Sequence, residues 1–231
     1  MTMLSAEPRP RVRHRLLVVA TFAVAMAWVE AAVVFYLRRL VDRIEPHQPD
    51  PLPIAGDLGG TEVIREAATL VMLLAVGWLA GRTWRARLGF ILTAFGAWDI
   101  FYYVFLRVMT GWPHSLFDWD VLFLIPLPWW GPVLAPVLIA LLMIVGGALL
   151  AGNDEHAGPP LWPAGWTIVL SGTGTGLALL VFMTDALRAL RHGESIQRLL
   201  PHTFNWPLFL AAWGLMMVSI VDLARRYFAR R

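Results

Sequence analysis

The 231-residue sequence contains neither cysteine nor lysine. Without cysteine, the chain cannot form disulfides, thiolate metal sites or iron–sulfur clusters. Without lysine, it cannot form a Schiff base with retinal, a carbonyl substrate or pyridoxal phosphate. The sequence carries no haem signal either. Redox chemistry through these groups and lysine-based covalent catalysis are therefore excluded.

Charged residues are also scarce, at 15%, whereas 58% of the residues are hydrophobic. This composition is too apolar for a soluble domain, and several uncharged runs approach the roughly 20 residues that span a bilayer. We predict a single transmembrane domain over residues 1–231, an all-α bundle of about six helices embedded in the lipid bilayer. The expected spans are residues 16–37, 63–81, 88–109, 133–151, 162–187 and 207–223.

A proline-rich segment interrupts the 30 uncharged residues between Val121 and Leu150. Its sequence, PLPWWGP at 126–132, cannot continue a regular helix because internal prolines remove helical hydrogen bonds. We predict a half-membrane or interfacial segment over 121–132, before the fourth span. Broken backbone at membrane depth is tolerated where protein covers it or where it lines a cavity.

The arginines give the predicted orientation. With six spans both termini lie on one side, and 11 of the 19 arginines fall there, within 9–15, 82–87 and 225–231. Positive residues favour the cytoplasmic side, so we predict an inner-membrane protein with cytoplasmic termini and outer loops 38–62, 110–132 and 188–206. The basic character then reflects membrane orientation, and we expect no nucleic-acid partner.

Glu30 is the only acid in the first apolar run. It shares a helix face with a stripe of small residues that includes Ala27, the kind of stripe that lets membrane helices approach closely. It lies eight residues before Arg38, about 12 Å below the outer end of the span. We therefore expect Glu30 to point into the bundle.

Asp99 lies at the matching depth of the third span, eight residues before Arg107. It continues a face that carries Gly89, Thr93 and Gly96. Ionisable groups at this depth are costly in lipid and usually have a function or a buried partner. Glu30 and Asp99 are therefore our candidate catalytic residues.

Most of the other unexplained ionisable residues belong to the outer half of the predicted bundle, which suggests a cavity open to the outside. Carboxylates with imidazole and no sulfur suit Zn, Mn or Fe, and a divalent metal is the candidate cofactor. The candidate metal ligands are Glu30, Glu66, Asp99, His114, Asp118 and Asp120. The candidate accessory residues are Arg107, Tyr103 and His202.

Simpler roles stay open for these residues. The loop residues also fit helix caps, loop acids and surface histidines, and Glu30 and Asp99 also fit interhelical hydrogen bonds. Neither HExxH nor GxSxG is present, so the metal hypothesis depends only on convergence in the predicted topology.

Three functions follow from this interpretation. The first is a metal-dependent membrane enzyme acting on a lipid- or quinone-like substrate. The second is a proton- or cation-coupled transporter or channel that uses the intramembrane acids. The third is a non-catalytic subunit of a membrane complex, and either a homo-oligomer or a membrane-complex partner is compatible with all three.

Overall fold

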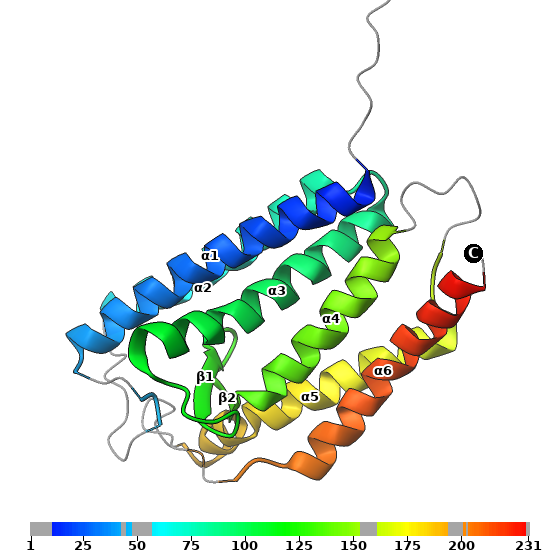
Figure 1. Ribbon diagram of the computed structural model, residues 1–231. Coiled ribbons are helices and arrows are strands. Elements are labelled where there is room, and N and C mark those ends of the chain that lie inside the picture. The colour runs from blue at the N-terminus through cyan, green and yellow to red at the C-terminus, as the bar shows by residue number, and fades with distance from the viewer. Residues whose placement is uncertain are drawn as a thin grey trace, which may run out of the picture.

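Six long helices make up most of the part of the protein that the structure describes (Figure 1). The computed structural model describes residues 11–42, 45–47, 57–152, 161–193, 201 and 203–229. Each helix is long and apolar enough to cross a membrane, which confirms the predicted polytopic helix bundle. The helices are α1 (Val12–Leu40), α2 (Asp57–Ala80), α3 (Trp84–Thr110), α4 (Leu134–Gly152), α5 (Gly165–His192) and α6 (Trp206–Phe228).

The second helix begins six residues before its predicted start at residue 63. The extra residues place Glu62 within the helix rather than in the preceding loop. The sequence shows a reason, since an apolar stretch of only 15 residues needs the neighbouring polar residues to reach bilayer length. Consequently a polar first half of α2 enters the bundle.

The third helix is the centre of the arrangement, because it packs against α1, α2 and α4. Thr83 caps its start by accepting a hydrogen bond from the Ala86 N–H at 3.2 Å. Gly111 ends it in the left-handed conformation, with φ of 79°, which glycine adopts without steric cost. The last two helices pack against each other, and α4 joins them to α3 by contacting α6.

Two predicted helix faces have the expected burial. On α1, Ala23, Ala27 and Ala31 are fully buried, and Glu30 on the same side is 6% exposed. On α3, Gly89 and Gly96 approach the backbone of α4 closely. The prediction that Glu30 points into the bundle is therefore confirmed.

A short β hairpin occupies the connection between α3 and α4. It consists of β1 (Trp119–Phe123) and β2 (Trp129–Pro132), antiparallel and with Asp120 opposite Gly131. Phe123 packs on Trp129 at 5.2 Å between ring centroids, and Trp129 stacks on Phe182 of α5 at 6.3 Å. The proline-rich segment thus forms a hairpin at one end of the bundle (Figure 1), and its depth in the membrane stays a prediction.

The two ends of the helical array lie together. In Figure 1, α1 begins and α6 ends at the same end of the bundle, opposite the hairpin. An even number of spans requires this arrangement. That the shared end faces the cytoplasm remains a prediction from the arginine distribution.

Candidate functional site

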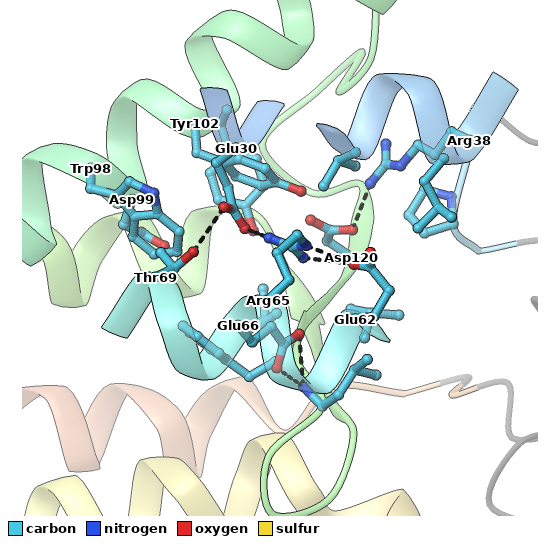
Figure 2. A pocket seen from close by; sticks show the side chains of 18 of the residues that line it. Glu30, Arg38, Glu62, Arg65, Glu66, Thr69, Trp98, Asp99, Tyr102 and Asp120 are labelled. Atoms are coloured by element: carbon cyan, nitrogen blue, oxygen red, sulfur yellow. Dashed lines mark hydrogen bonds and ion pairs between the residues drawn. The ribbon is translucent and has the colours of Figure 1, made fainter. Parts of the chain in front are cut away.

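A cavity of about 110 Å³ lies between α1, α2, α3 and the hairpin (Figure 2). Its wall is unusual for a membrane bundle because it is rich in ionisable side chains. Within the described part of the chain, α4, α5 and α6 contribute nothing to the wall. The ionisable residues that line it are Glu30, Arg38, Glu62, Arg65, Glu66, Asp99, Tyr102, Tyr103 and Asp120.

The cavity extends to one end of the bundle. On α1 it follows one face from Glu30 to Val41, just beyond the end of the helix, and reaches Pro46 in the following loop. The first half of α2, the second half of α3 and the hairpin meet at the same end. This is the end that the arginine distribution predicts to face outward.

Glu30 is held by two residues of α2. Arg65 Nη1 donates a hydrogen bond to Glu30 Oε1, and the Thr69 hydroxyl donates to Oε2 at 3.0 Å. Arg65 also binds Glu62 Oε2 through Nη2 at 2.8 Å. Because Arg65 lies between two carboxylates, the charge of Glu30 is compensated and its side chain is fixed.

Asp120 of β1 forms a second ion pair, with Arg38 of α1. Arg38 Nη2 lies 3.1 Å from Asp120 Oδ1, and the two side chains are only 7% and 2% exposed. The guanidinium also stacks over Trp112 at 4.3 Å from the ring centroid. Burial raises the pKa of Asp120, although the neighbouring Arg38 guanidinium and Tyr103 hydroxyl oppose the rise. This pair fastens the hairpin to α1.

Glu66 fastens the hairpin to α2. Its carboxylate accepts a hydrogen bond from the backbone N–H of Leu124, at 2.9 Å from Oε2 and 3.2 Å from Oε1. The donor is a neutral amide at the end of β1, so this contact brings no positive charge to Glu66. Glu66 therefore joins α2 to the hairpin through a main-chain contact.

Asp99 differs from the other acids of the cavity. It is 8% exposed, and its Oδ2 atom is buried without a hydrogen-bond partner in the described part of the chain. Among the same residues, no hydrogen bond or ion pair involves its carboxyl group. Figure 2 shows it beside Trp98 and Thr69, on the side of the cavity away from Arg38. Asp99 is thus a buried acid without a compensating cation.

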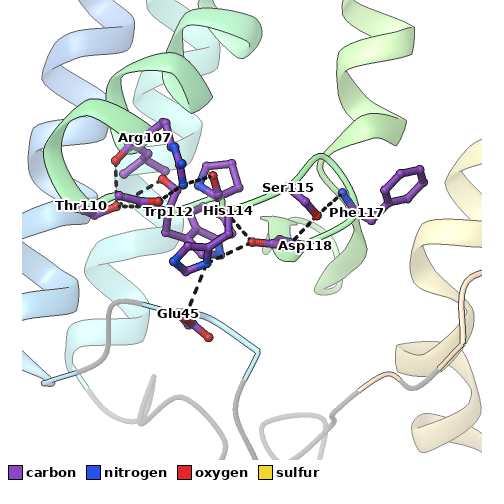
Figure 3. Close-up of polar contacts among 11 residues, drawn as sticks. Glu45, Arg107, Thr110, Trp112, His114, Ser115, Phe117 and Asp118 are labelled. Atoms are coloured by element: carbon purple, nitrogen blue, oxygen red, sulfur yellow. Dashed lines mark hydrogen bonds and ion pairs between the residues drawn. The ribbon is translucent and has the colours of Figure 1, made fainter.

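The structure divides the predicted site residues between two places. Five of them line the cavity, whereas two belong to the exposed loop after α3 (Figure 3). The five are Glu30, Glu66, Asp99, Tyr103 and Asp120. The two are His114 and Asp118.

The loop residues form a separate polar group. The His114 ring lies 3.5 Å from Asp118 Oδ2 and 3.8 Å from Glu45 Oε1, and its side chain is 63% exposed. Asp118 accepts hydrogen bonds from the His114 N–H at 2.7 Å and the Ser115 hydroxyl at 2.9 Å. Although desolvation opposes them, these contacts hold the pKa of Asp118 below its usual range. Asp118 therefore stabilises the loop, which agrees with the alternative interpretation of this residue as a loop acid.

Of the other two predicted accessory residues, one lies outside the cavity and one lies outside the described part of the chain. Arg107 is exposed and donates to the carbonyl oxygens of Gly111 and Pro113, the latter at 2.9 Å, so it fixes the end of α3 (Figure 3). His202 lies outside the described residues.

Sequence reasoning missed four residues that are central to the cavity: Arg38, Glu62, Arg65 and Thr69. A signal for three of them exists on α2, where positions 62, 65, 66 and 69 follow helical spacing and share one face. Such a polar face on a membrane helix indicates a cavity or a partner. Arg38 had no comparable signal, because it also fits the end of a span.

A preformed metal centre is not evident in this arrangement. Within the described ranges, no group of three or more His, Cys, Asp or Glu side chains could hold a metal ion. The predicted metal ligands that line the cavity are all carboxylates, and His114 lies in the loop. Metal binding by the predicted residues therefore stays a prediction.

The fold and the cavity define a multi-pass integral membrane protein with a charged cavity at one end of its helix bundle. Comparisons with protein-family models, with curated proteins and with solved structures give no match. The function must therefore be argued from the cavity itself.

Proposed function

We propose that the protein is a transporter that exchanges a small cation for protons, with Asp99 as the group that carries one or the other. The single observation that carries this proposal is the buried Asp99 carboxyl group, which has no cation beside it in the described part of the chain. A carboxylate in such a place is stabilised by a proton or by a bound cation.

Exchange follows if a proton and a cation compete for the Asp99 carboxylate. When a monovalent cation binds the carboxylate, the proton that occupied it is released, so charge is conserved one for one. Glu30 is unsuited to this role because Arg65 already compensates it. Asp120 is likewise paired with Arg38. These pairs hold the walls, and Glu66 is occupied by the Leu124 N–H, while Asp99 remains available for a ligand.

Transport also requires a path from Asp99 to the opposite side. Towards the start of α1, an apolar cluster that α1 and α3 share includes Ala23, Ala27 and Ala94 together with the larger side chains of Val19 and Phe90. In an alternating-access cycle, this contact would open while the end near the hairpin closes.

The test uses proteoliposomes that contain a trapped pH indicator. When Na⁺ or K⁺ is added outside, we expect one of these gradients to drive proton movement through the wild-type protein. Asp99→Asn keeps the size of the side chain but cannot exchange a proton. We expect it to reduce the cation-driven flux at least about tenfold, as for loss of an essential proton-transfer group.

Asp185→Asn is the matched control. Asp185 lies on α5, outside the cavity wall, and faces Arg188 on the same helix at 3.7 Å. We expect this variant to retain wild-type flux. Cation-driven flux that survives in Asp99→Asn would contradict the proposed role of Asp99. The exchanger itself would be contradicted if neither these ions nor tetramethylammonium drove proton movement through the wild-type protein.

A metal-dependent enzyme acting on a lipid- or quinone-like substrate is the second candidate. It is favoured by the presence of Asp99 and Asp120 in one cavity, since two carboxylates with water can bind a hard cation. Of the predicted metals, Mn suits a pair of carboxylates best, because Zn and Fe sites commonly include imidazole. Under this hypothesis, metal analysis of purified protein gives about one Mn per chain, and Asp99→Asn loses it.

A further inference from the structure

We infer that the cation recognised by this cavity is a small organic ammonium ion rather than a bare inorganic ion. This inference rests on the proposed function only in requiring that the cavity binds a cation. Three properties of the wall support it: its charge, its aromatic side chains and its size.

The first property is an excess of acidic groups. Five carboxylic acids and two arginines line the cavity. Arg65 is bound to Glu30 and Glu62, and Arg38 is bound to Asp120. Asp99 therefore faces the cavity without a positive partner from these two side chains. A ligand with one positive charge would supply what Asp99 lacks, whereas an anionic ligand would add to the excess.

The second property is the aromatic surface beside Asp99. Trp98 and Tyr102 stack at 6.1 Å between centroids with an interplanar angle of 25°, and Phe123 of β1 lies 6.3 Å from Trp98. All three residues line the cavity. Aromatic faces attract ammonium groups whose substituents are too apolar to be well hydrated, and they are the usual walls of sites for methylated ammonium ions.

A bare metal ion would bind the same cavity less favourably than an organic cation. Inorganic cations need several oxygen ligands arranged around them, as in calcium and magnesium sites. In the described part of the protein, no group of three acidic or histidine side chains has that arrangement. The combination of the uncompensated Asp99 carboxylate with aromatic faces fits an organic cation better.

The third property limits the size of the ligand. The cavity volume is about 110 Å³. For comparison, an engineered protein cavity of about 150 Å³ binds benzene. A cation of about five non-hydrogen atoms, such as tetramethylammonium, is therefore expected to fit. Tetrabutylammonium carries the same charge but is too large.

Isothermal titration calorimetry on the detergent-purified protein tests the inference with tetramethylammonium, tetrabutylammonium and Na⁺ as chlorides. We expect tetramethylammonium to bind at least about tenfold more tightly than either of the others. Equal or tighter binding of Na⁺, or no binding of tetramethylammonium, would overturn the inference. Equal binding of tetrabutylammonium would overturn it as well, because a site of this size cannot enclose that ion.

Three variants locate the binding. Asp99→Asn and Trp98→Leu are each expected to weaken tetramethylammonium binding about tenfold or more, whereas Trp98→Phe retains an aromatic face and most of the affinity. Trp166→Leu, at an exposed tryptophan on α5, is the control and should bind as wild type. Gel filtration and circular dichroism establish that each variant is folded. Unchanged affinity in folded Asp99→Asn or Trp98→Leu would place the ion elsewhere.

The flux experiment separates this inference from the proposed function. Binding of tetramethylammonium without proton movement in proteoliposomes would leave the ligand class standing and reject the exchanger. If Na⁺ drives proton movement that is lost in Asp99→Asn, and tetramethylammonium does not bind, the exchanger is supported and the ligand class is rejected.

Discussion

Replacing Asp120 with alanine should destabilise the protein by about 3–5 kcal/mol, since removal of one partner of a buried ion pair leaves the other charge uncompensated. The pair qualifies because Arg38 Nη2 lies 3.1 Å from Asp120 Oδ1 and both side chains are almost fully buried. The cost should be measured as the free energy of unfolding in mixed micelles, with helix content followed by circular dichroism.

The double variant Arg38→Met/Asp120→Leu separates loss of charge balance from loss of the contact. Removing both charges leaves no unpaired ion, so this variant should be more stable than Asp120→Ala alone. Asp185→Ala is the control on α5, where the partly exposed pair with Arg188 should contribute at most about 1 kcal/mol. A double variant no more stable than Asp120→Ala would show that the hairpin depends on something other than this charge pair.

The contact between α3 and α4 should also be sensitive, to the addition of a single methyl group. A Cβ atom at Gly147 would lie 2.5 Å from the Gly89 carbonyl oxygen and 2.8 Å from the Thr93 backbone nitrogen. Backbone atoms cannot rotate away, so Gly147→Ala must separate the helices. We expect a loss of about 1–3 kcal/mol in unfolding free energy, the usual cost of overpacking.

Gly89→Ala should act similarly, because its Cβ would lie 2.6 Å from the Gly147 carbonyl oxygen. The two substitutions disturb one contact, so their effects should not add. Gly172→Ala and Gly176→Ala on α5 are matched controls, since nothing lies within 4 Å of a Cβ at either position. Equal losses at Gly147 and Gly172 would mean that glycine's conformational properties, rather than helix contact, determine the cost.

The membrane fold could be predicted because hydrophobic length is a strong local signal. Six apolar runs gave six helices, and the small-residue stripe on α1 placed Glu30 inside the bundle. The proline-rich segment was recognised as an interruption, but its hairpin was not predicted. Strand pairing depends on contacts of Phe123 and Trp129 with α3 and α5, which the local sequence does not specify.

The candidate site was only partly predictable. Depth along the predicted spans placed Glu30 and Asp99 at one level, and both line the cavity. The depth of a residue along a span does not determine which way its side chain points around the helix axis. It also does not determine the path of a loop. His114 and Asp118 were therefore grouped with cavity acids from which the structure separates them. The partners of Glu30 and Asp120 were missed because Arg65 and Arg38 come from other elements, distant in sequence.

The hairpin wall allows ligand selectivity and bundle stability to be altered separately. Residues 121–124 form one side of the cavity, yet they belong to a hairpin and not to a membrane-spanning helix. The loop from 124 to 128 is anchored to α2 through the backbone N–H of Leu124, which any residue except proline can supply. A library of side chains at 121 and 124 can therefore reshape the recognition surface, while Phe123 keeps its contact with α3 and Asp120 and Glu66 keep theirs.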